Sequence, residues 1–178
     1  MKTHVLIVSR YFPATHKRKG EPTFFVDKVL HRSATVGLDD IERLKPFDID
    51  MFMNCEPKLH TIRANYALWS KRIKEVQEGK AVLSVRYWAG RPYHKDENGI
   101  GQVEVFKLDK DSVVGIQKIE FSRTDFHFPI IDGWQGGHIN PDNLAKNDGL
   151  SLDDFKEWFR KYDLSKTMVI IHFTGFRY

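Results

Sequence analysis

Short runs of apolar residues rich in Val and Ile predict several β-strands along the chain. The most apolar run is residues 168–173, whose centre of Val and Ile is typical of a central strand. Residues 81–88 and 102–106 alternate between apolar and polar positions, and the turn-rich stretch 90–101 between them predicts a connection. Two further strands are expected over residues 4–11 and 113–121.

Apolar residues also recur at helical spacing. Trp69, Ile73 and Val76 are four and three residues apart, which predicts a helix over residues 69–78. Gly79 follows directly and stands where the C-terminal cap of a helix belongs, because glycine adopts the left-handed conformation that such caps need.

Residues 151–162 show the best helical pattern in the chain. Ser151 and Asp154 at its start match a capping-box-like pair, in which the serine side chain bonds to a backbone amide of the first turn. A further helix is expected over residues 24–34, with Thr23 as its N-cap. The apolar stripe of the best helix consists of Leu152, Phe155, Trp158 and Phe159.

The segments between these elements are harder to assign. Residues 38–54 and 58–65 show no clear period, residues 125–143 resemble a loop, and residues 144–149 suggest one helical turn. Strands dominate, helices fall between them without regular alternation, and no repeat or linker interrupts the chain. We therefore expect one domain over residues 1–178, of the α+β class, with a curved or barrel-like sheet.

The composition agrees with a folded domain. The 178 residues are 41% hydrophobic and 29% charged, which excludes intrinsic disorder. No run of about 18 apolar residues occurs, so a membrane span is excluded. Cys55 is the single cysteine and has no partner for an intramolecular disulfide, which fits a cytoplasmic protein. The net charge of +4 permits binding to a polyanion without requiring it.

Several catalytic and cofactor motifs are absent from the sequence. The glycines form neither a P-loop nor a dinucleotide-binding fingerprint, and there is no Gly-x-Ser-x-Gly elbow for a nucleophilic serine. The 8 histidines are scattered singly, without the spacing of zinc ligands. We therefore expect neither a metal nor a cofactor.

A loop with a basic tip is expected over residues 12–22, where Pro13, Gly20 and Pro22 break regular structure. Basic residues interleaved with aromatic rings are typical of a loop that contacts phosphates, although a solvated surface turn has the same composition. The residues concerned are Arg10, Tyr11, Phe12, His16, Lys17, Arg18 and Lys19. A second basic and aromatic surface is expected at Arg86, Trp88, Arg91 and Tyr93.

Residues 58–63 read Lys-Leu-His-Thr-Ile-Arg and precede the predicted helix that ends at a glycine. Downstream, residues 86–93 form an aromatic strand and hairpin, and residues 145–151 lead from an acidic residue into a capped helix. With the final strand around residues 170–174, these motifs occur in the order found in the ASCH branch of the PUA-like superfamily. The chain resembles that family over residues 55–178.

This resemblance implies a PUA-like fold, a small mixed β-barrel with peripheral helices and a cleft on one side. The family is associated with RNA, and some small members are amidohydrolases that act on N4-acetylcytidine. In those members a Lys, a Thr and an acidic residue form the catalytic group, and the resemblance carries these roles to Lys58, Thr61 and Asp148. The amidohydrolases have a glutamate where this chain has Asp148.

The chemistry of this trio depends on the lysine. A threonine hydroxyl is a poor nucleophile at neutral pH and needs a base to accept its proton. Lys58 can act as that base only if burial or a neighbouring cation lowers its pKa. Arg63 shares a side with Thr61 if the segment is extended, and supplies such a charge. The carboxylate of Asp148 raises the lysine pKa, and the sequence alone leaves the balance open.

Three functions remain open at this point. We favour a domain that binds RNA or a nucleotide-like ligand, such as a modified nucleoside, in a basic and polar cleft around the Lys-x-x-Thr-x-Arg motif. One alternative is an amidohydrolase that removes acyl groups from N4-acylated cytidine, and another is a protein-interaction domain with a vestigial cleft. The residues expected to contact the ligand or RNA are Arg63, His60, Lys17, Arg18, Lys19, Arg86, Trp88 and Arg91.

Overall fold

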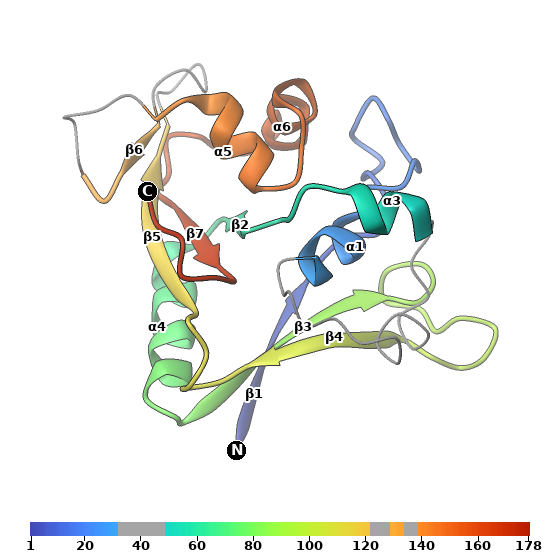
Figure 1. Cartoon of the computed structure of the whole chain (residues 1–178), viewed down its shortest axis with the longest axis horizontal. Helices are drawn as coiled ribbons and strands as arrows, with labels where there is room; N and C mark the ends of the chain where they lie inside the picture. The colour runs from blue at the N-terminus through green and yellow to red at the C-terminus, as the bar shows by residue number, and fades with distance from the viewer. Residues whose placement is uncertain (32–48, 122–128, 134–138) are drawn as a thin grey trace.

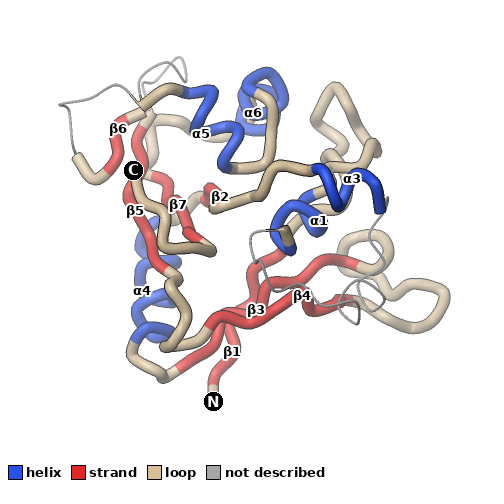
Figure 2. The backbone as a smooth tube through the Cα atoms, in the orientation of Figure 1, coloured by secondary structure: helices blue, strands red, loops and turns tan. Residues whose placement is uncertain are grey.

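The computed structural model describes residues 1–31, 49–121, 129–133 and 139–178. Their strands form two sheets (Figures 1 and 2). In the first sheet the order is β1-β3-β4, with β1 parallel to β3 and β3 antiparallel to β4. These strands are β1 (Lys2–Ile7), β3 (Ala81–Trp88) and β4 (Gln102–Leu108).

The second sheet contains the strand that carries the Lys-x-x-Thr-x-Arg motif. Its order is β2-β7-β5-β6, and all of its pairs are antiparallel. The strands are β2 (His60–Arg63), β7 (Met168–His172), β5 (Gly115–Glu120) and β6 (Ile130–Ile131). β7 lies between two neighbours and is buried at every position, which confirms the prediction of a central strand there.

Five helices are described, and they pack around the two sheets. They are α1 (Phe25–Leu30), α3 (Ile49–Asn54), α4 (Tyr66–Gln77), α5 (Pro141–Asn147) and α6 (Leu152–Phe159). α4 packs against β3, β5 and β7, whereas α5 packs against α6 (Figure 1). None of the described helices has the length and hydropathy needed to cross a membrane.

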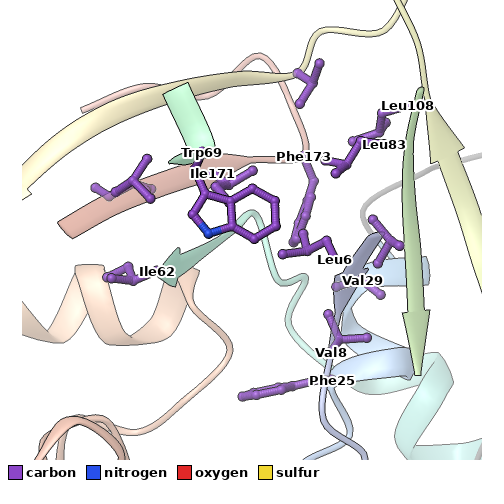
Figure 3. Close-up of a cluster of buried hydrophobic side chains, with 14 of the residues drawn as sticks. Leu6, Val8, Phe25, Val29, Ile62, Trp69, Leu83, Leu108, Ile171 and Phe173 are labelled. Atoms are coloured by element: carbon purple, nitrogen blue, oxygen red, sulfur yellow. The ribbon is translucent and has the colours of Figure 1, made fainter. Parts of the chain in front are cut away.

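One hydrophobic core joins the two sheets (Figure 3). Leu6 and Leu83 come from the first sheet, Ile171 and Phe173 come from β7 and the residue after it, and Val29 comes from α1. Each of these five side chains is at most 1% exposed. Burying a side chain of this size contributes about 1.5–3 kcal/mol, so this shared core stabilises the packing of one sheet against the other.

Most predicted strands are present, some with shifted ends. The predictions over residues 81–88, 102–106 and 113–121 correspond to β3, β4 and β5. The first strand lies earlier than predicted, because its parallel pairing with β3 begins at Lys2 and ends at Ile7.

The two best helix predictions are confirmed together with their caps. The Ser151 side chain accepts a hydrogen bond from the Asp154 amide at 3.2 Å, as the capping pattern predicts. α4 is followed by Gly79, whose φ of +71° is the left-handed conformation expected after a helix. At its other end, the side chain of Asn65 caps α4 by accepting a bond from the Leu68 amide.

The prediction that Thr23 is the N-cap of the first helix is wrong. Phe24 occupies that position, in a left-handed conformation with a φ of 56°. The hydroxyl of Thr23 instead donates to the carbonyl of Ser9 at 2.6 Å and accepts from the Phe25 amide at 3.2 Å. α1 ends at Leu30, and the rest of the predicted helix lies outside the described residues.

Elements also occur where the sequence patterns were indistinct. Residues 58–65 contain β2, and residues 38–54 contain α3, with the remainder outside the described residues. The helical turn expected over residues 144–149 belongs to α5, which begins earlier, at Pro141. That start lies inside the loop predicted over residues 125–143. Proline breaks the interior of a helix, but it suits the first helical position, where Pro141 stands.

The α+β class is confirmed by this arrangement. The expected closure into a small mixed β-barrel is not found among the described strands. The sheets β1-β3-β4 and β2-β7-β5-β6 share no strand, and it is side-chain packing that holds them together.

Candidate functional site

Backbone hydrogen bonds hold the motif segment between three other parts of the fold. The Lys58 amide donates to the Lys28 carbonyl of α1, and the Leu59 amide donates to the Asn147 carbonyl of α5, each at 2.9 Å. The Phe173 amide, just after β7, donates to the Leu59 carbonyl at 2.9 Å. Side chains from both helices and from the second sheet therefore meet around the start of β2.

Lys58 and Asp148 form a buried ion pair at this meeting point. Their residues are 1% and 4% exposed, and Lys58 Nζ lies 2.6 Å from Asp148 Oδ1. The same ammonium group donates to the backbone carbonyl of Asp148 and lies 4.2 Å from the centre of the Phe25 ring. Two of the three residues predicted as catalytic are therefore in direct contact.

Burial and charge act in opposite directions on this pair. Burial lowers the pKa of Lys58 to about 8, although the neighbouring carboxylate of Asp148 acts to raise it. Burial also raises the pKa of Asp148, against the opposing effect of the Lys58 charge. Desolvation is thus the larger effect on both groups, and Lys58 is an amine that loses its proton slightly above neutral pH.

Thr61 and Arg63 lie on one face of β2 and His60 on the other, as the alternation of side chains along a strand requires. Arg63 donates to the carbonyl of Ile7 at 2.6 Å and so ties β2 to the first sheet. Thr61 is buried, and in the described part of the chain no hydrogen bond joins it to the Lys58–Asp148 pair. The structure therefore brings together only part of the predicted trio.

Hydrogen bonds join His60, Tyr178 and Asn147 in a chain of contacts beside the ion pair. His60 Nε2 lies 2.7 Å from the Tyr178 hydroxyl, which also accepts a bond from Asn147 Nδ2 at 3.0 Å. His60 Nδ1 lies 3.8 Å from Asp148 Oδ1. We assign the proton to Nδ1, since the tyrosine hydroxyl then donates to Nε2 and the ring N–H faces the carboxylate. Burial lowers the pKa of His60 well below its usual value, so the ring is neutral.

A pocket of about 580 Å³ adjoins this chain of contacts. Three asparagines line it, and their spacing of three and four residues places them on one face of α5 and its cap. We call it the asparagine pocket, and the lining residues used below are Glu56, Asn140, Asn143, Lys146, Asn147, Phe176 and Tyr178.

Part of the basic loop is engaged within the protein. Arg18 Nη1 lies 2.7 Å from Asp154 Oδ2, and its guanidinium group lies 4.6 Å from the centre of the Phe12 ring. These contacts fasten the loop to α6, so Arg18 has a structural role. Lys17 and Lys19 are exposed at the tip of the loop, and the side chain of the ion-paired Arg18 is itself 44% exposed.

The second basic and aromatic surface belongs to the first sheet and the turn after β3. Arg86 is half-buried, and its Nη2 lies 3.6 Å from Glu104 Oε2. The Trp88 ring is half-buried, with its centre 5.2 Å from that of Tyr93, whereas Arg91 is exposed. These residues do not lie on the strand that carries the motif, so the predicted ligand-binding residues form more than one surface.

The structure gives no sign of a metal centre in the part of the chain that it describes, because no group of three or more His, Cys, Asp or Glu side chains has a suitable arrangement. Comparison with protein-family models, with curated proteins and with solved structures finds no match to this chain.

Sequence reasoning missed the asparagines and Tyr178. The spacing of Asn140, Asn143 and Asn147 was a usable signal, but it was obscured because residues 125–143 resembled a loop. Tyr178 carried no such signal, since its contact with His60 joins positions 118 residues apart.

Proposed function

We propose that the protein binds a nucleobase-like ligand, either a nucleoside or a base of RNA, in the asparagine pocket. The observation that carries this proposal is the combination of three carboxamides and two aromatic rings around a hollow of about 580 Å³. Carboxamides present both donors and acceptors, as the edges of bases do, and aromatic rings provide surfaces on which bases stack. Pockets for small ligands have volumes of about 300–1,000 Å³.

The asparagines offer complementary atoms to such a ligand. Asn140 Oδ1 accepts a bond from the Asp142 amide at 2.8 Å, and its Nδ2 is a donor for a ligand. Asn147 Nδ2 donates to Tyr178, and its Oδ1 is an acceptor. Asn143 is exposed and offers both kinds of atom. A planar group with a donor and an acceptor on one edge matches this set.

The charge of the pocket favours the base over the phosphate as the group that is bound. Lys146 is the cation in the lining, and its Nζ lies 3.1 Å from Glu56 Oε1. Because the two charges offset one another, the pocket has no excess of positive charge with which to hold a phosphate. We therefore expect an uncharged base or nucleoside to bind.

In this proposal the Lys, Thr and Arg of the Lys-x-x-Thr-x-Arg motif support the pocket, and Leu59 of the same segment lines it. Asp148 follows Asn147 at the end of α5, and Lys58 holds both the side chain and the carbonyl of Asp148. The resemblance to the ASCH family, which is associated with RNA, supports the same class of ligand. We propose that the chain belongs to that family and has its PUA-like fold.

Calorimetric titration with cytidine, uridine, adenosine and N4-acetylcytidine tests the proposal. Asn143→Ala removes a donor and an acceptor, and we expect the affinity to fall about 3- to 10-fold for each hydrogen bond lost. The matched control is Asn98→Ala, an exposed asparagine in the turn between β3 and β4, which should bind as the unchanged protein does. If no nucleoside binds, or if Asn143→Ala binds equally well, the proposal is wrong and a protein-interaction domain becomes the better interpretation.

An amidohydrolase is the second candidate, and the lowered pKa of Lys58 favours it. With a pKa of about 8, part of the Lys58 population is a neutral amine near neutral pH, as a general base for Thr61 must be. Incubation with N4-acetylcytidine, followed by chromatography for cytidine, tests this activity. Lys58→Ala and Thr61→Ala should each abolish the release of cytidine, and Asn98→Ala should not. Absence of release from the unchanged protein would reject the enzyme but not the binding proposal.

A further inference from the structure

A second hollow, of about 380 Å³, lies between the segment that follows β1 and the end of β3. It is lined by three aromatic residues and by two prolines and an arginine, namely Tyr11, Phe12, Trp88, Pro13, Pro92 and Arg10. We call it the tryptophan pocket. In Figure 1 the turn after β3 lies at the right of the view and the C-terminus at the left, so this pocket is distant from Tyr178 and the asparagine pocket.

The rings around the tryptophan pocket face solvent more than core aromatics do. Tyr11 is 47% exposed and Tyr93 is 87% exposed, and the Tyr93 ring centre lies 5.2 Å from that of Trp88. The core rings Phe155 and Phe173 are each fully buried by comparison. Exposed rings around a hollow provide surfaces on which a base can stack.

Basic residues outnumber acidic residues beside this pocket. Residues 10–21 and 86–97, which lie on its two sides, contain seven Lys or Arg and three Asp or Glu residues. Arg18 and Arg86 are paired with Asp154 and Glu104, so the net charge of this region, with both partners included, is +2. Arg91, Lys17 and Lys19 are all exposed. An anionic chain is therefore the partner whose charge is complementary.

We infer that the tryptophan pocket binds single-stranded nucleic acid, with a base stacked against Trp88 and Tyr11 and with phosphates held by Arg91 and the basic loop. A duplex fits less well, because its bases are already stacked inside the helix and cannot enter a hollow. Proline-rich peptides also dock into aromatic grooves, but they lack the negative charge that this surface favours. This site does not depend on the asparagine pocket and binds a strand rather than a single nucleoside.

Fluorescence anisotropy with a labelled oligouridylate of about ten nucleotides, a length that covers one stacking site and its flanking phosphates, tests the inference. Trp88→Ala should weaken binding about 5- to 100-fold, which is the effect of losing one stacked base. Arg91→Glu alters an exposed side chain without disturbing the core, and it should reduce both the affinity and the dependence of binding on salt.

The matched control is Lys166→Glu, which makes the same change of charge at a side chain that is 79% exposed in the loop before β7. It should weaken binding far less than Arg91→Glu does. If the two charge reversals weaken binding equally, attraction is non-specific and the inference is wrong. It is also wrong if a duplex of the same length binds as tightly, or if a proline-rich peptide quenches Trp88 fluorescence whereas oligouridylate does not.

Two cross-tests separate this inference from the proposed function. Asn143→Ala should weaken oligouridylate binding far less than Trp88→Ala does, since Asn143 lines only the asparagine pocket. Trp88→Ala should bind nucleosides with unchanged affinity, since Trp88 lines only the tryptophan pocket. Loss of oligouridylate binding in Asn143→Ala but not in Trp88→Ala would place the strand in the asparagine pocket and overturn the inference.

Discussion

Among single residues, Lys58 and Asp148 form a buried ion pair, and losing one member of it should change the stability of the protein strongly. Taking an ion out of water costs several kcal/mol, and only a partner at short distance offsets that cost. Lys58→Met keeps most of the side-chain volume but leaves the Asp148 carboxylate buried without its cation. We expect the free energy of unfolding to fall by about 3–5 kcal/mol, measured by urea denaturation at neutral pH.

A double variant separates the loss of charge from the loss of packing. Asp148→Asn removes the charge but keeps a side chain of nearly the same size and shape. The protein with both Lys58→Met and Asp148→Asn should therefore be more stable than the protein with Lys58→Met alone. If it is not, the loss comes from packing around residue 58, and the ion pair has little energetic weight.

The same variant should show a characteristic dependence on pH. Burial raises the pKa of Asp148 even beside Lys58, and removal of the cation raises it further. A carboxyl group with a higher pKa in the folded state holds its proton more tightly there, so stability is greatest below the unfolded pKa and falls as the pH rises through the folded value. Relative to the unchanged protein, Lys58→Met should lose stability from about pH 4 upwards. Asp148→Asn in the same background should remove this slope.

The contact between Lys58 and Asp148 was foreseeable because both residues belong to motifs that occur in a recognisable order. The contact of His60 with Tyr178 was not, because it depends on how β2 and the segment after β7 are placed in three dimensions. Thr61 shows the limit of motif reasoning, since alternation along β2 directs it away from the face of His60.

Among the elements, α5 lines the asparagine pocket, and a glycine in the turn after it packs against the buried Lys58. Gly149 has a φ of +81°, and a Cβ at this position would lie 3.4 Å from side-chain atoms of Lys28, Lys58 and Phe25. The left-handed conformation costs a residue with a Cβ about 1–2 kcal/mol. Gly149→Ala should therefore reduce the free energy of unfolding by about that amount, as chemical denaturation would show.

Two other glycines provide controls for this prediction. Gly99 also has a positive φ, of +77°, but no atom lies within 4 Å of the position that a Cβ would occupy, so Gly99→Ala reports the backbone cost alone. Gly175 has an ordinary φ and equally open surroundings, so Gly175→Ala should change stability by less than about 0.5 kcal/mol. A loss in Gly149→Ala no larger than that in Gly175→Ala would contradict the argument.

An element could be predicted from the sequence when the residues that specify it lie within the element itself. The cap at Ser151 and the apolar stripe of α6 lie within one helix and were confirmed. β2 was missed because it has only four residues, and its burial on both faces comes from β7 and the helices around it. The start of α5 was missed because Pro141 was taken as a helix breaker, although it occupies the first helical position.

At the scale of the whole molecule, the two sheets are linked by side chains rather than by a backbone ladder. Phe173 follows β7 in the second sheet, and its ring centre lies 6.0 Å from that of Phe106 in β4 of the first sheet. The α+β class could be predicted from the order of apolar patterns along the chain. The pairings of β1 with β3, of β2 with β7 and of β5 with β7 could not, because they join segments that are distant in sequence and the apolar pattern does not specify partners.

This architecture makes a testable prediction about cooperativity. Phe173→Ala removes a fully buried ring from the core that both sheets share, and we expect a loss of about 3–5 kcal/mol in the free energy of unfolding. Because that core is continuous, amides in β3 and in β7 should lose hydrogen-exchange protection by similar amounts. Val113→Ala, at a side chain that is 62% exposed, is the control and should leave both sets of amides unchanged. If only the β7 amides lose protection, the sheets unfold independently, and the chain then comprises two cooperative units instead of one.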